Sequence, residues 1–568
     1  MPLDTILFLR LRDAQGPLDF DLNVLATTAQ GVINRTEPRV VVENPISERD
    51  ERALGTEHWL ARFTEGDSWL TGCNVEELDD VAELLRRCDG LVRGLVIFDP
   101  TVPASSNVAV TLAGRERLAV TGPDGFAWLQ ERGVNLSAVH DLRGRFANKR
   151  EAYDWMIANQ IKGRSDVTML SNVLDAFCRA GGGGEDGMEI DGLDYTVANA
   201  GVAFDLDPWP DEIPVDDPQQ PLGSDQERWH ALFTAASKAR AGESPLEVTG
   251  FPPWKVKYSD HANAGGKRRP HETEWEAVWR LTPHGAFLNP LFAPNMSFHR
   301  WAPLPTVMEQ PDPGPPPPLE NKTYVCLHLG DFDGSYGLYR RFPKLWSDAR
   351  RGELPLNWGI NPNLARNYPD IIADAYATRS PNDHFSADAG AAGYVNPNRL
   401  LAAQEAGTMP VSALDLWRRF CRHWYRRLGY TLSPMVLDQH HPMPQVLDAF
   451  QEFSPKGVAY LIENRHGEDV ARLEHRLWRD MPVARLEDMS YAKSDEEMAD
   501  WMLRYAEGDS MDTPAFHIYR FEWKAPSLIF DTFREAQRRA QDRGRSREWV
   551  AVHPRHWFQL LRQHLSGE

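Results

Sequence analysis

Short apolar runs alternate with longer helical patterns along both halves of the chain, and this alternation limits the fold more than any other feature. The strand-like runs of the first half are Thr5–Leu11, Arg39–Val42 and Leu95–Phe98. Helical spacing lies between them at Phe20–Gln30 and at Asn74–Cys88, where we expect Asn74 to be the N-cap. This order predicts a parallel sheet covered by helices, and therefore a small α/β domain over residues 1–145.

A proline-rich segment, Pro311–Pro318 (PDPGPPPP), predicts a stiff linker between the two halves. Directly after it, Lys322–Leu329 is strongly β-prone. Further strands are expected at Met435–Leu437, Gly457–Ile462 and Ala515–Tyr519, with helices at Asn363–Tyr376, Ser412–Leu428, Met443–Phe453 and Glu496–Glu507. This rhythm predicts a second α/β domain, a distorted (β/α) barrel-like domain over residues 320–568 that carries the chemistry.

The intervening residues 146–310 predict a helical and loop-rich region that packs on the barrel. Glu151–Ala180 has a helical pattern, and Asp205–Gly223 is dense in Pro and Asp, which is typical of an exposed loop. Gly182, Gly184 and Gly187 match GxGxxG spacing. Because they follow a helix rather than a strand, we expect a flexible turn there and not a phosphate site.

Composition describes a soluble globular chain with an acidic balance. The 82 Asp and Glu against 62 Lys and Arg give a net charge of −20 in 568 residues. Nucleic-acid binding needs a basic surface, so we expect no nucleic-acid partner and no adhesion to anionic membranes. The 19 Trp residues are many for one chain, and indole faces can serve as platforms for sugar rings. A carbohydrate or another polar small molecule is therefore the expected substrate or ligand.

The cysteines and the N-terminus indicate a cytoplasmic protein. Five cysteines lie far apart without a CxxC pair, so neither a zinc knuckle nor a disulfide framework is indicated. The apolar stretch Ile6–Leu11 is short and is broken by Arg10, which favours a strand over a signal peptide. No stretch approaches the ~18 uninterrupted apolar residues of a membrane span.

The sharpest local feature is Gly330-Asp331-Phe332-Asp333-Gly334, directly after a predicted strand. Alternate side chains of an extended backbone point the same way, so Asp331 and Asp333 are expected to share one face. Two such carboxylates can act as an acid/base pair, grip sugar hydroxyls or bind a divalent cation. Apart from a possible divalent cation at Asp331 and Asp333, we expect no cofactor and assign no metal-binding residues.

Other acids also follow predicted strands or precede small-residue loops. They are Asp383, Asp438 and Glu463. These side chains converge on one pocket with Asp331 and Asp333 if the second half closes into a barrel. The sequence contains no GxSxG elbow, no GxxxxGK[ST] loop and no GxGxxG after a strand, so acyl hydrolase, P-loop and Rossmann functions have no motif support.

Several blocks in the same order resemble the GxGYxYP family of glycoside hydrolases. In the first half they are Ala29–Val42 (AQGVINRTEPRVVV), Gly94–Pro100, Asn107–Gly114 and Leu193–Pro208; in the second half they are Gly330–Tyr336, Arg350–Pro362 and Asn382–Pro397. The motif that names the family reads Ala391-Ala392-Gly393-Tyr394-Val395-Asn396-Pro397 here, so Ala replaces its first Gly and Asn its second Tyr. The backbone freedom of that Gly and the second phenol are missing, which indicates a diverged branch.

The resemblance implies a C-terminal barrel-like domain with an acidic cleft, in which paired carboxylates hydrolyse a glycosidic bond. The candidate catalytic residues are Asp331, Asp333, Asp383, Asp438 and Glu463; the candidate substrate-binding residues are Tyr336, Trp358, His384, Asp388, Tyr394 and Asn396. One carboxyl must stay protonated near neutral pH, while the other stays ionised. Two alternatives remain open: a metal-dependent sugar transferase that uses Asp331 and Asp333, and a glycan-binding protein without turnover.

Overall fold

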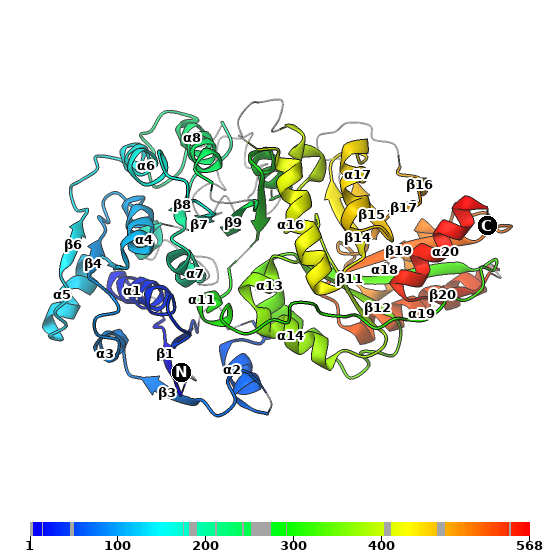
Figure 1. Cartoon of the computed structure of the whole chain (residues 1–568), viewed down its shortest axis with the longest axis horizontal. Helices are drawn as coiled ribbons and strands as arrows, with labels where there is room; N and C mark the ends of the chain where they lie inside the picture. Colours follow the sequence, from blue (N-terminus) through cyan, green and yellow to red (C-terminus); the bar gives the residue numbers. More distant parts are fainter. Residues whose placement is uncertain are drawn as a thin grey trace. The chain divides into compact units, whose positions relative to one another are not determined.

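The computed structural model describes most of the chain. The described residues are 4–13, 15–45, 50–66, 68–173, 175–180, 190–210, 213–240, 244–250, 274–290, 292–402, 411–462, 472–544 and 547–567. The chain forms two compact units, coloured along the sequence in Figure 1. The first is Met1–Pro303 with Asn367–Asp370 and Ala403–Ala413, and the second comprises Leu304–Arg366, Ile371–Ala402 and Leu414–Glu568. The boundaries at residues 145 and 310 stay predictions.

The first unit is α/β, as the alternation predicts, and all its paired strands are parallel. Its strands are β1 (Thr5–Arg10), β2 (Val40–Glu43), β3 (Asn74–Leu78), β4 (Leu95–Ile97), β5 (Ala119–Thr121), β6 (Ala138–Asp141), β7 (Met169–Asn172), β8 (Val202–Phe204), β9 (Leu246–Gly250) and β10 (Ala286–Asn289). They form three sheets with the orders β2-β1-β3, β5-β4-β6 and β10-β9-β7-β8.

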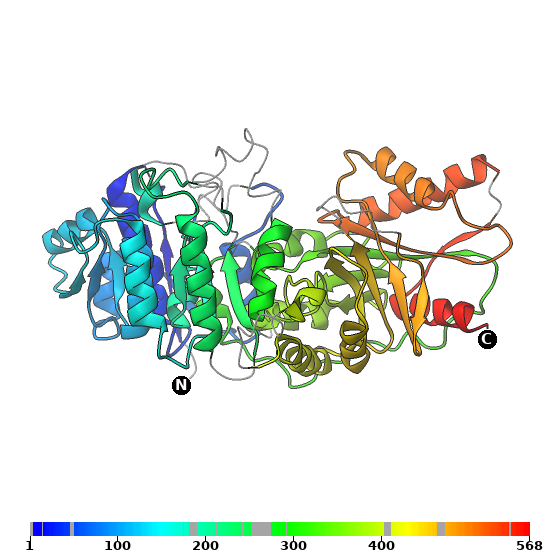
Figure 2. The ribbon, with the colours of Figure 1, turned by 90° about the horizontal axis from the view of Figure 1, so that it is seen from above.

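Helices flank these sheets, as Figure 2 shows for the blue-to-green part of the chain. They are α1 (Pro17–Ile33), α2 (Thr56–Thr64), α3 (Val81–Arg87), α4 (Ser105–Glu116), α5 (Pro123–Glu131), α6 (Lys149–Met156), α7 (Leu193–Ala198), α8 (Ser224–Lys238), α10 (Glu274–Leu281) and α11 (Met296–His299), with a π-helical turn η1 (Ile157–Ile161) and the 3-10 turns η2 (Ala176–Ala180) and η4 (Thr282–His284). Pro17 and Pro123 stand in the first turns of α1 and α5, where a missing N–H costs nothing.

Two helix predictions in this unit are confirmed only in part. Residues 74–78 form β3, which pairs with β1, and the following helix begins only at Val81 with Asp80 as its N-cap. The carboxylate of Asp80 accepts from the backbone N–H of Glu83, so the helix signal belongs to Asp80 and not to Asn74. Likewise the pattern over 151–180 contains β7, which pairs with both β8 and β9. The glycine run 181–184 lies outside the described residues.

The second unit is also α/β. Its strands are β11 (Thr323–Phe332), β12 (Leu356–Ile360), β13 (Asp383–Ser386), β14 (Leu432–Asp438), β15 (Gly457–Ile462), β16 (Arg476–Trp478), β17 (Met481–Arg485), β18 (Glu487–Asp488), β19 (Ala515–Glu522) and β20 (Trp549–Ala551). Its helices and turns are η5 (Gly337–Arg341, π-helical), α12 (Phe342–Trp346), α13 (Leu364–Asn367), α14 (Pro369–Thr378), η6 (Pro397–Leu400), α16 (Ala413–Leu428), α17 (Pro444–Phe453), α18 (Asp495–Tyr505), α19 (Pro526–Asp542) and α20 (Pro554–Ser566). Residues 367–370 of α13 and α14 belong to the first unit.

Two open sheets form this unit, and no closed barrel is found among its described residues. One sheet has the order β13-β12-β11-β19-β18, with β20 also paired to β11, and the other has the order β14-β15-β17-β16. The chain passes from one sheet to the other through Leu486, which lies between β17 and β18. A barrel would require β13 and β14, the edge strands of the two sheets, to pair, but no hydrogen-bonded pairing joins these two strands. Side chains such as Ile518, Trp557 and Phe558 fill the core between these sheets and α20.

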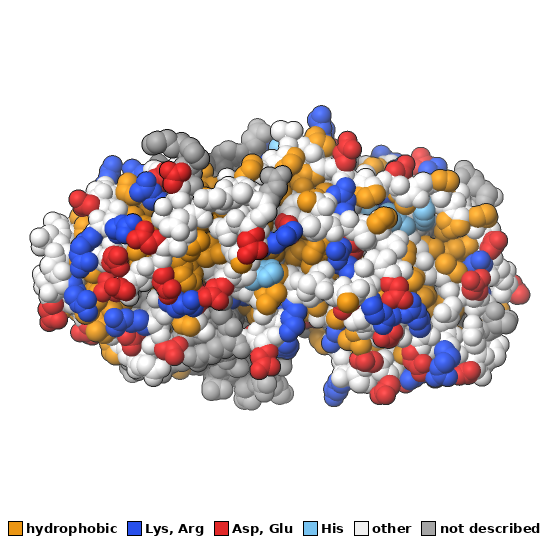
Figure 3. Space-filling view, turned by 90° about the horizontal axis from the view of Figure 1, so that it is seen from below, with side chains coloured by type: hydrophobic (Ala, Val, Ile, Leu, Met, Phe, Trp, Pro, Cys, Tyr) orange, Lys and Arg blue, Asp and Glu red, His pale blue; other side chains and the backbone are white. Residues whose placement is uncertain are grey.

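The surface carries charges of both signs. On the face shown in Figure 3, Lys and Arg side chains are interspersed with Asp and Glu. None of the helices in the described part of the chain is long and apolar enough to cross a membrane.

Candidate active site

Two acidic side chains lie at the ends of paired strands in the second unit. The strands β11 and β19 run parallel and in register, so that Gly330 lies opposite Glu522. Asp331 follows Gly330 directly. Both acids therefore lie at the same carboxyl edge of the sheet, which is where parallel α/β folds carry their chemistry. Figure 1 shows β11 and β19 in this unit.

The backbone adopts an unusual conformation at both strand ends. Asp331 has φ 75° and Trp523 has φ 43°, both in the left-handed region. The N–H of Asp331 donates to Oδ2 of Asp388 at 2.7 Å, and its carbonyl accepts from Nε1 of Trp523 at 2.9 Å. A left-handed non-glycine residue costs roughly 1–2 kcal/mol, and such outliers persist where neighbours hold them, often at active sites.

This conformation changes one expectation about the DFD segment. The prediction that Asp331 and Asp333 share a face rests on extended backbone, and the backbone at Asp331 is not extended. The pairing of β11 with β12 also shifts register between Leu329 and Phe332. Asp333 follows the end of β11 and is 8% exposed. The alternation argument therefore gives no reason to pair the two carboxylates.

The carboxyl group of Asp331 is surrounded by protein yet still reaches solvent. Its side chain is 28% exposed. Desolvation and the neighbouring charge of Glu522 raise the pKa of Asp331 to about 7, although Arg520 opposes them. A carboxyl that titrates near neutral pH can hold a proton and release it to a substrate, as a general acid requires.

Arg520 is held in place on the far side of Asp331. One arm of its guanidinium donates to Oδ1 of Asp331 at 2.9 Å, and the other donates to Oδ1 of Asp488 at 3.2 Å and to Oγ of Ser490 at 2.5 Å. The Arg520 side chain is only 7% exposed. Because its position is fixed by Asp488 and Ser490, Arg520 also fixes the orientation of the Asp331 carboxyl.

Glu522 has a different environment. It is the last residue of β19 and is partly exposed. No hydrogen bond or ion pair of its carboxylate is found within the described part of the chain. It nevertheless lies close enough to Asp331 to be the strongest charge that raises the pKa of that residue. Its oxygens are therefore open to a substrate.

A buried polar layer supports the site from behind. Asp388 is fully buried, and its Oδ1 lies 3.6 Å from Nε2 of His328. Nδ2 of Asn357 lies 2.6 Å from Nδ1 of His328, and Oδ1 of Asn357 lies 2.8 Å from Nδ1 of His384. Burial lowers the pKa of His384 well below its usual range, so this histidine is neutral and structural.

Two glycines make room for this layer. A Cβ at Gly359 would lie 2.8 Å from the His328 ring and 2.9 Å from Cγ of Asp388, and a Cβ at Gly330 would lie 3.0 Å from Oδ2 of Asp388. Because side chains at these positions would displace Asp388, both glycines contribute to the placement of Asp331.

Aromatic side chains lie next to the acids. The rings of Tyr336 and Trp523 are 6.0 Å apart, and the guanidinium of Arg341 lies over both of them. Trp523 is partly exposed, whereas Tyr336 is 8% exposed. An exposed indole face beside carboxylates is a suitable surface for a sugar ring.

Asp383 lies at the opposite edge of the sheet from Asp331 and Glu522, and Trp358 bonds to it; a role for either residue in the site stays a prediction. Asp383 begins β13, so it lies at the amino edge of the sheet and not at the carboxyl edge. Its carboxylate accepts from Nε1 of Trp358 at 2.9 Å, from the backbone of Ser380 at 2.8 Å, and from the guanidinium of Arg351. Trp358 is fully buried. Both residues hold the sheet together.

Asp438 ends β14, but its carboxylate is enclosed. It accepts from the backbone N–H groups of Asn398 at 3.0 Å and Gln439 at 2.8 Å. Burial raises the pKa of Asp438 to about 7, yet the residue is 0% exposed. Asn396 donates to the carbonyl of Leu437 at 3.2 Å. This arrangement anchors the segment after Tyr394, which is itself 5% exposed. Glu463 lies outside the described residues.

The described residues contain no group of three or more His, Cys, Asp or Glu side chains arranged to hold a metal ion.

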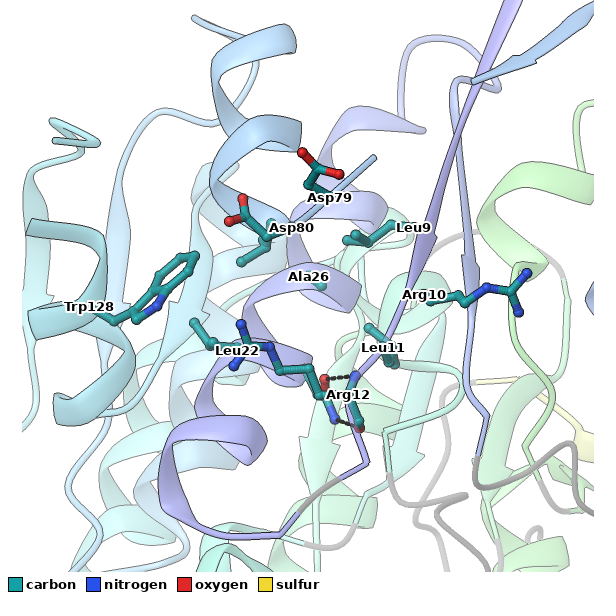
Figure 4. Close-up of a pocket in the computed structure, with 11 residues that line it drawn as sticks. Leu9, Arg10, Leu11, Arg12, Leu22, Ala26, Asp79, Asp80 and Trp128 are labelled. Atoms are coloured by element: carbon teal, nitrogen blue, oxygen red, sulfur yellow. Dashed lines mark hydrogen bonds between the residues drawn. The ribbon is translucent and has the colours of Figure 1, made fainter. Parts of the chain in front are cut away.

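A small hollow also lies at the end of β1 in the first unit, and Figure 4 shows Arg12, Asp80 and Trp128 around it. Its volume is about 50 Å³, which is room for one or two water molecules. This hollow is too small for a sugar.

Four residues of the site were not predicted from the sequence: Glu522, Arg520, Asp488 and His328. A signal for Glu522 exists: residues 516, 518, 520 and 522 alternate along β19, and the last two of them are charged. A strand face that changes from apolar to charged toward its carboxyl end is the pattern that Asp331 also shows on β11.

Comparisons with known proteins identify a family. A family model described as "GxGYxYP putative glycoside hydrolase C-terminal domain" matches residues 321–562, and one described as "GxGYxYP_N second domain" matches residues 92–163. No curated protein matches the chain.

Among solved structures, the chain is similar to one titled as a "putative hydrolase from Bacteroides thetaiotaomicron VPI-5482". The TM-score is 0.71 and the sequence identity 16%, and the match covers 99% of this chain and 95% of that chain. At this identity the likeness shows a shared fold.

Proposed function

Since the chain belongs to the GxGYxYP family, whose C-terminal domain is described as that of a glycoside hydrolase, we propose that it hydrolyses a glycosidic bond at the carboxyl ends of β11 and β19. The observation that carries this proposal is the pair formed by Asp331 and Glu522, at the ends of two strands that lie in register. One of the two carboxyls titrates near neutral pH and the other is open to solvent.

The two carboxyls take different roles in this mechanism. Asp331 carries the proton and donates it to the oxygen of the departing sugar, because burial disfavours its charged form. Glu522 acts either as the nucleophile or as the base that activates water. A carboxyl separation of ~5–5.5 Å corresponds to retention of the anomeric configuration, and ~6.5–9.5 Å corresponds to inversion.

The surrounding residues bind the substrate and orient the Asp331 carboxyl. Arg520 holds the Asp331 carboxyl, while Asp388 holds the backbone on which it is carried. The partly exposed face of Trp523 supports a sugar ring. The order of strands through the two sheets supports a distorted, incompletely closed barrel, and Asp331 and Glu522 give its carboxyl end an acidic character.

Hydrolysis of aryl glycosides and unlabelled oligosaccharides by the wild type and two variants tests the proposal. We expect Glu522→Gln and Asp331→Asn each to lower kcat by about 10²–10⁴-fold, the contribution of a positioned acid or base. Asp512→Asn, which changes an exposed acid of the same unit, is the matched control. Wild-type turnover in both site variants would refute the assignment.

Other outcomes of this experiment favour the alternatives. Glycan binding that persists in both variants, without turnover in the wild type, would indicate a glycan-binding protein. Turnover that requires Mg²⁺ or Mn²⁺ together with a nucleotide sugar would indicate a transferase that uses Asp331 and Asp333.

A further inference from the structure

A hollow in the first unit lies between α8 and the loop that follows η1. It has a volume of about 730 Å³. Pockets that bind small molecules in proteins usually have volumes of about 300–1,000 Å³. The size of this groove therefore suits a small organic ligand.

Cations surround the groove. Lys162 and Arg164 line it from the loop, and Lys238 lines it from α8, together with the imidazole of His230. Among the described residues that line the groove there is no Asp or Glu, in a chain whose net charge is −20. Arg164 pairs with Asp166 at 2.6 Å. No ion pair of Lys162 or Lys238 is found in the part of the chain that the structure describes.

The floor of the groove is apolar and made of small residues. Ala231, Ala235 and Ala239 lie on one face of α8 and its C-terminal cap, and Gly163 faces them from the loop. Small side chains leave space for a bulky ligand body, which would remove apolar surface from water there. His230 adds a polar group, since burial lowers its pKa and favours the neutral imidazole.

The loop has an unusual origin. The helix α6 continues as the π-helical turn η1, whose cap is the N–H of Lys162 bonded to the carbonyl of Ile157 at 3.0 Å. Single π-helical turns are rare in α-helices and frequently occur at functional sites. Here the turn sets the position at which Lys162 and Arg164 leave the helix and reach the groove.

We propose that this groove binds a small amphipathic anion, in which a carboxylate or phosphate is attached to an apolar body. Lys162 and Lys238 hold the acidic group, and the alanine floor covers the apolar body. This inference stands apart from the proposed glycosidase activity, because it uses residues of the first unit alone.

Titration with three naphthalene compounds tests the proposal. We expect 2-naphthoate and 2-naphthyl phosphate to bind the full-length protein, and neutral 2-naphthol to bind at least about tenfold more weakly. The stronger of the two anions identifies the acidic group. Lys162→Gln and Lys238→Gln should each weaken anion binding about two- to fivefold, the size of an exposed ion pair.

Two further variants separate specific binding from general charge. Ala231 is exposed, so Ala231→Trp fills the groove without disturbing the core, and we expect it to abolish binding. Arg86→Gln removes an exposed cation of the same unit that does not line the groove, and it should bind as the wild type does. The proposal is overturned by absence of saturable binding, by equal binding of 2-naphthol, or by wild-type affinity in Ala231→Trp.

Discussion

Replacing Asp331 by Asn should stabilise the protein at alkaline pH while it removes turnover. The pKa of Asp331 is raised from 3.8 to about 7, mainly by burial and then by Glu522. Between these two values the folded state keeps a proton that the unfolded state has lost. Stability therefore falls as the pH rises through this window, and the penalty is complete above about pH 7.

The size of the penalty follows from the shift. A difference of about three pKa units corresponds to about 4 kcal/mol, at 1.36 kcal/mol for each unit. Because the side chain is 28% exposed, solvent screening reduces this value, and we expect about 2–4 kcal/mol. Asparagine cannot ionise and avoids the penalty. The stability advantage of the variant over the wild type should therefore grow from pH 5 to pH 7 and be complete by pH 8.

Thermal unfolding of both proteins between pH 5 and pH 8 measures this difference. The exposed variant Asp512→Asn serves as the control and should show no trend with pH. A stability difference between Asp331→Asn and the wild type that does not change with pH would refute the reasoning. A variant that becomes less stable than the wild type as the pH rises would show that the charged form of Asp331 is favoured.

Three further predictions concern other residues of the second unit. Ala391 stands at the first glycine of the family motif with φ 74°, so Ala391→Gly should raise the free energy of unfolding by about 0.5–1 kcal/mol in urea denaturation; a loss of stability would contradict this. Burial lowers the pKa of His517, but Glu487 and Asp509 outweigh it and raise the pKa to about 9. His517→Gln should therefore cost about 2–4 kcal/mol of unfolding free energy below pH 6.5 and progressively less as the pH approaches 9. An equal cost at pH 6 and at pH 9 would argue against an ionised His517. Asp383→Asn should cost about 2–3 kcal/mol, because Arg351 and Trp358 lose their acceptor, while kcat of the folded variant should stay near that of the wild type; a thousandfold loss would return Asp383 to the site.

The positions of four strands in the second unit, β11, β14, β15 and β19, follow from local patterns. Residues 457–462 form β15 as predicted, because a continuous apolar run between turn residues leaves few other structures. The helical pattern over residues 74–88 was misleading, because it covers both the strand β3 and the helix α3 that follows it. The charged strand β3 forms only because β1 offers it a pairing edge, and this contact is distant in sequence.

Closure of the barrel could not be judged from strand order. The strands occur in an order that suits a ring, yet β13 ends at Ser386 and the chain then enters a buried segment with positive φ at Ala389 and Ala391. That segment places the carboxylate of Asp388 where it accepts a hydrogen bond from the backbone N–H of Asp331. The alternation of strands and helices contains no information about such a segment.

The site could be predicted in part. Asp331 was found because an acid after an apolar strand is a local signal. Glu522 was missed because its relation to Asp331 depends on the register of two strands that are far apart in sequence. Asp383 was expected at the site, but it lies at the amino end of β13. The sequence indicates that an acid is near a strand without showing at which end of the strand it lies.

The pH dependence of kcat/KM on a cleaved glycoside is the most direct test of the central claim. If Asp331 is the general acid, kcat/KM should fall above about pH 7, as the pKa of Asp331 requires. The residual activity of Asp331→Asn should lack this alkaline limb. A rate that stays constant from pH 6 to pH 9, or an Asp331→Asn variant with the wild-type profile, would contradict the account.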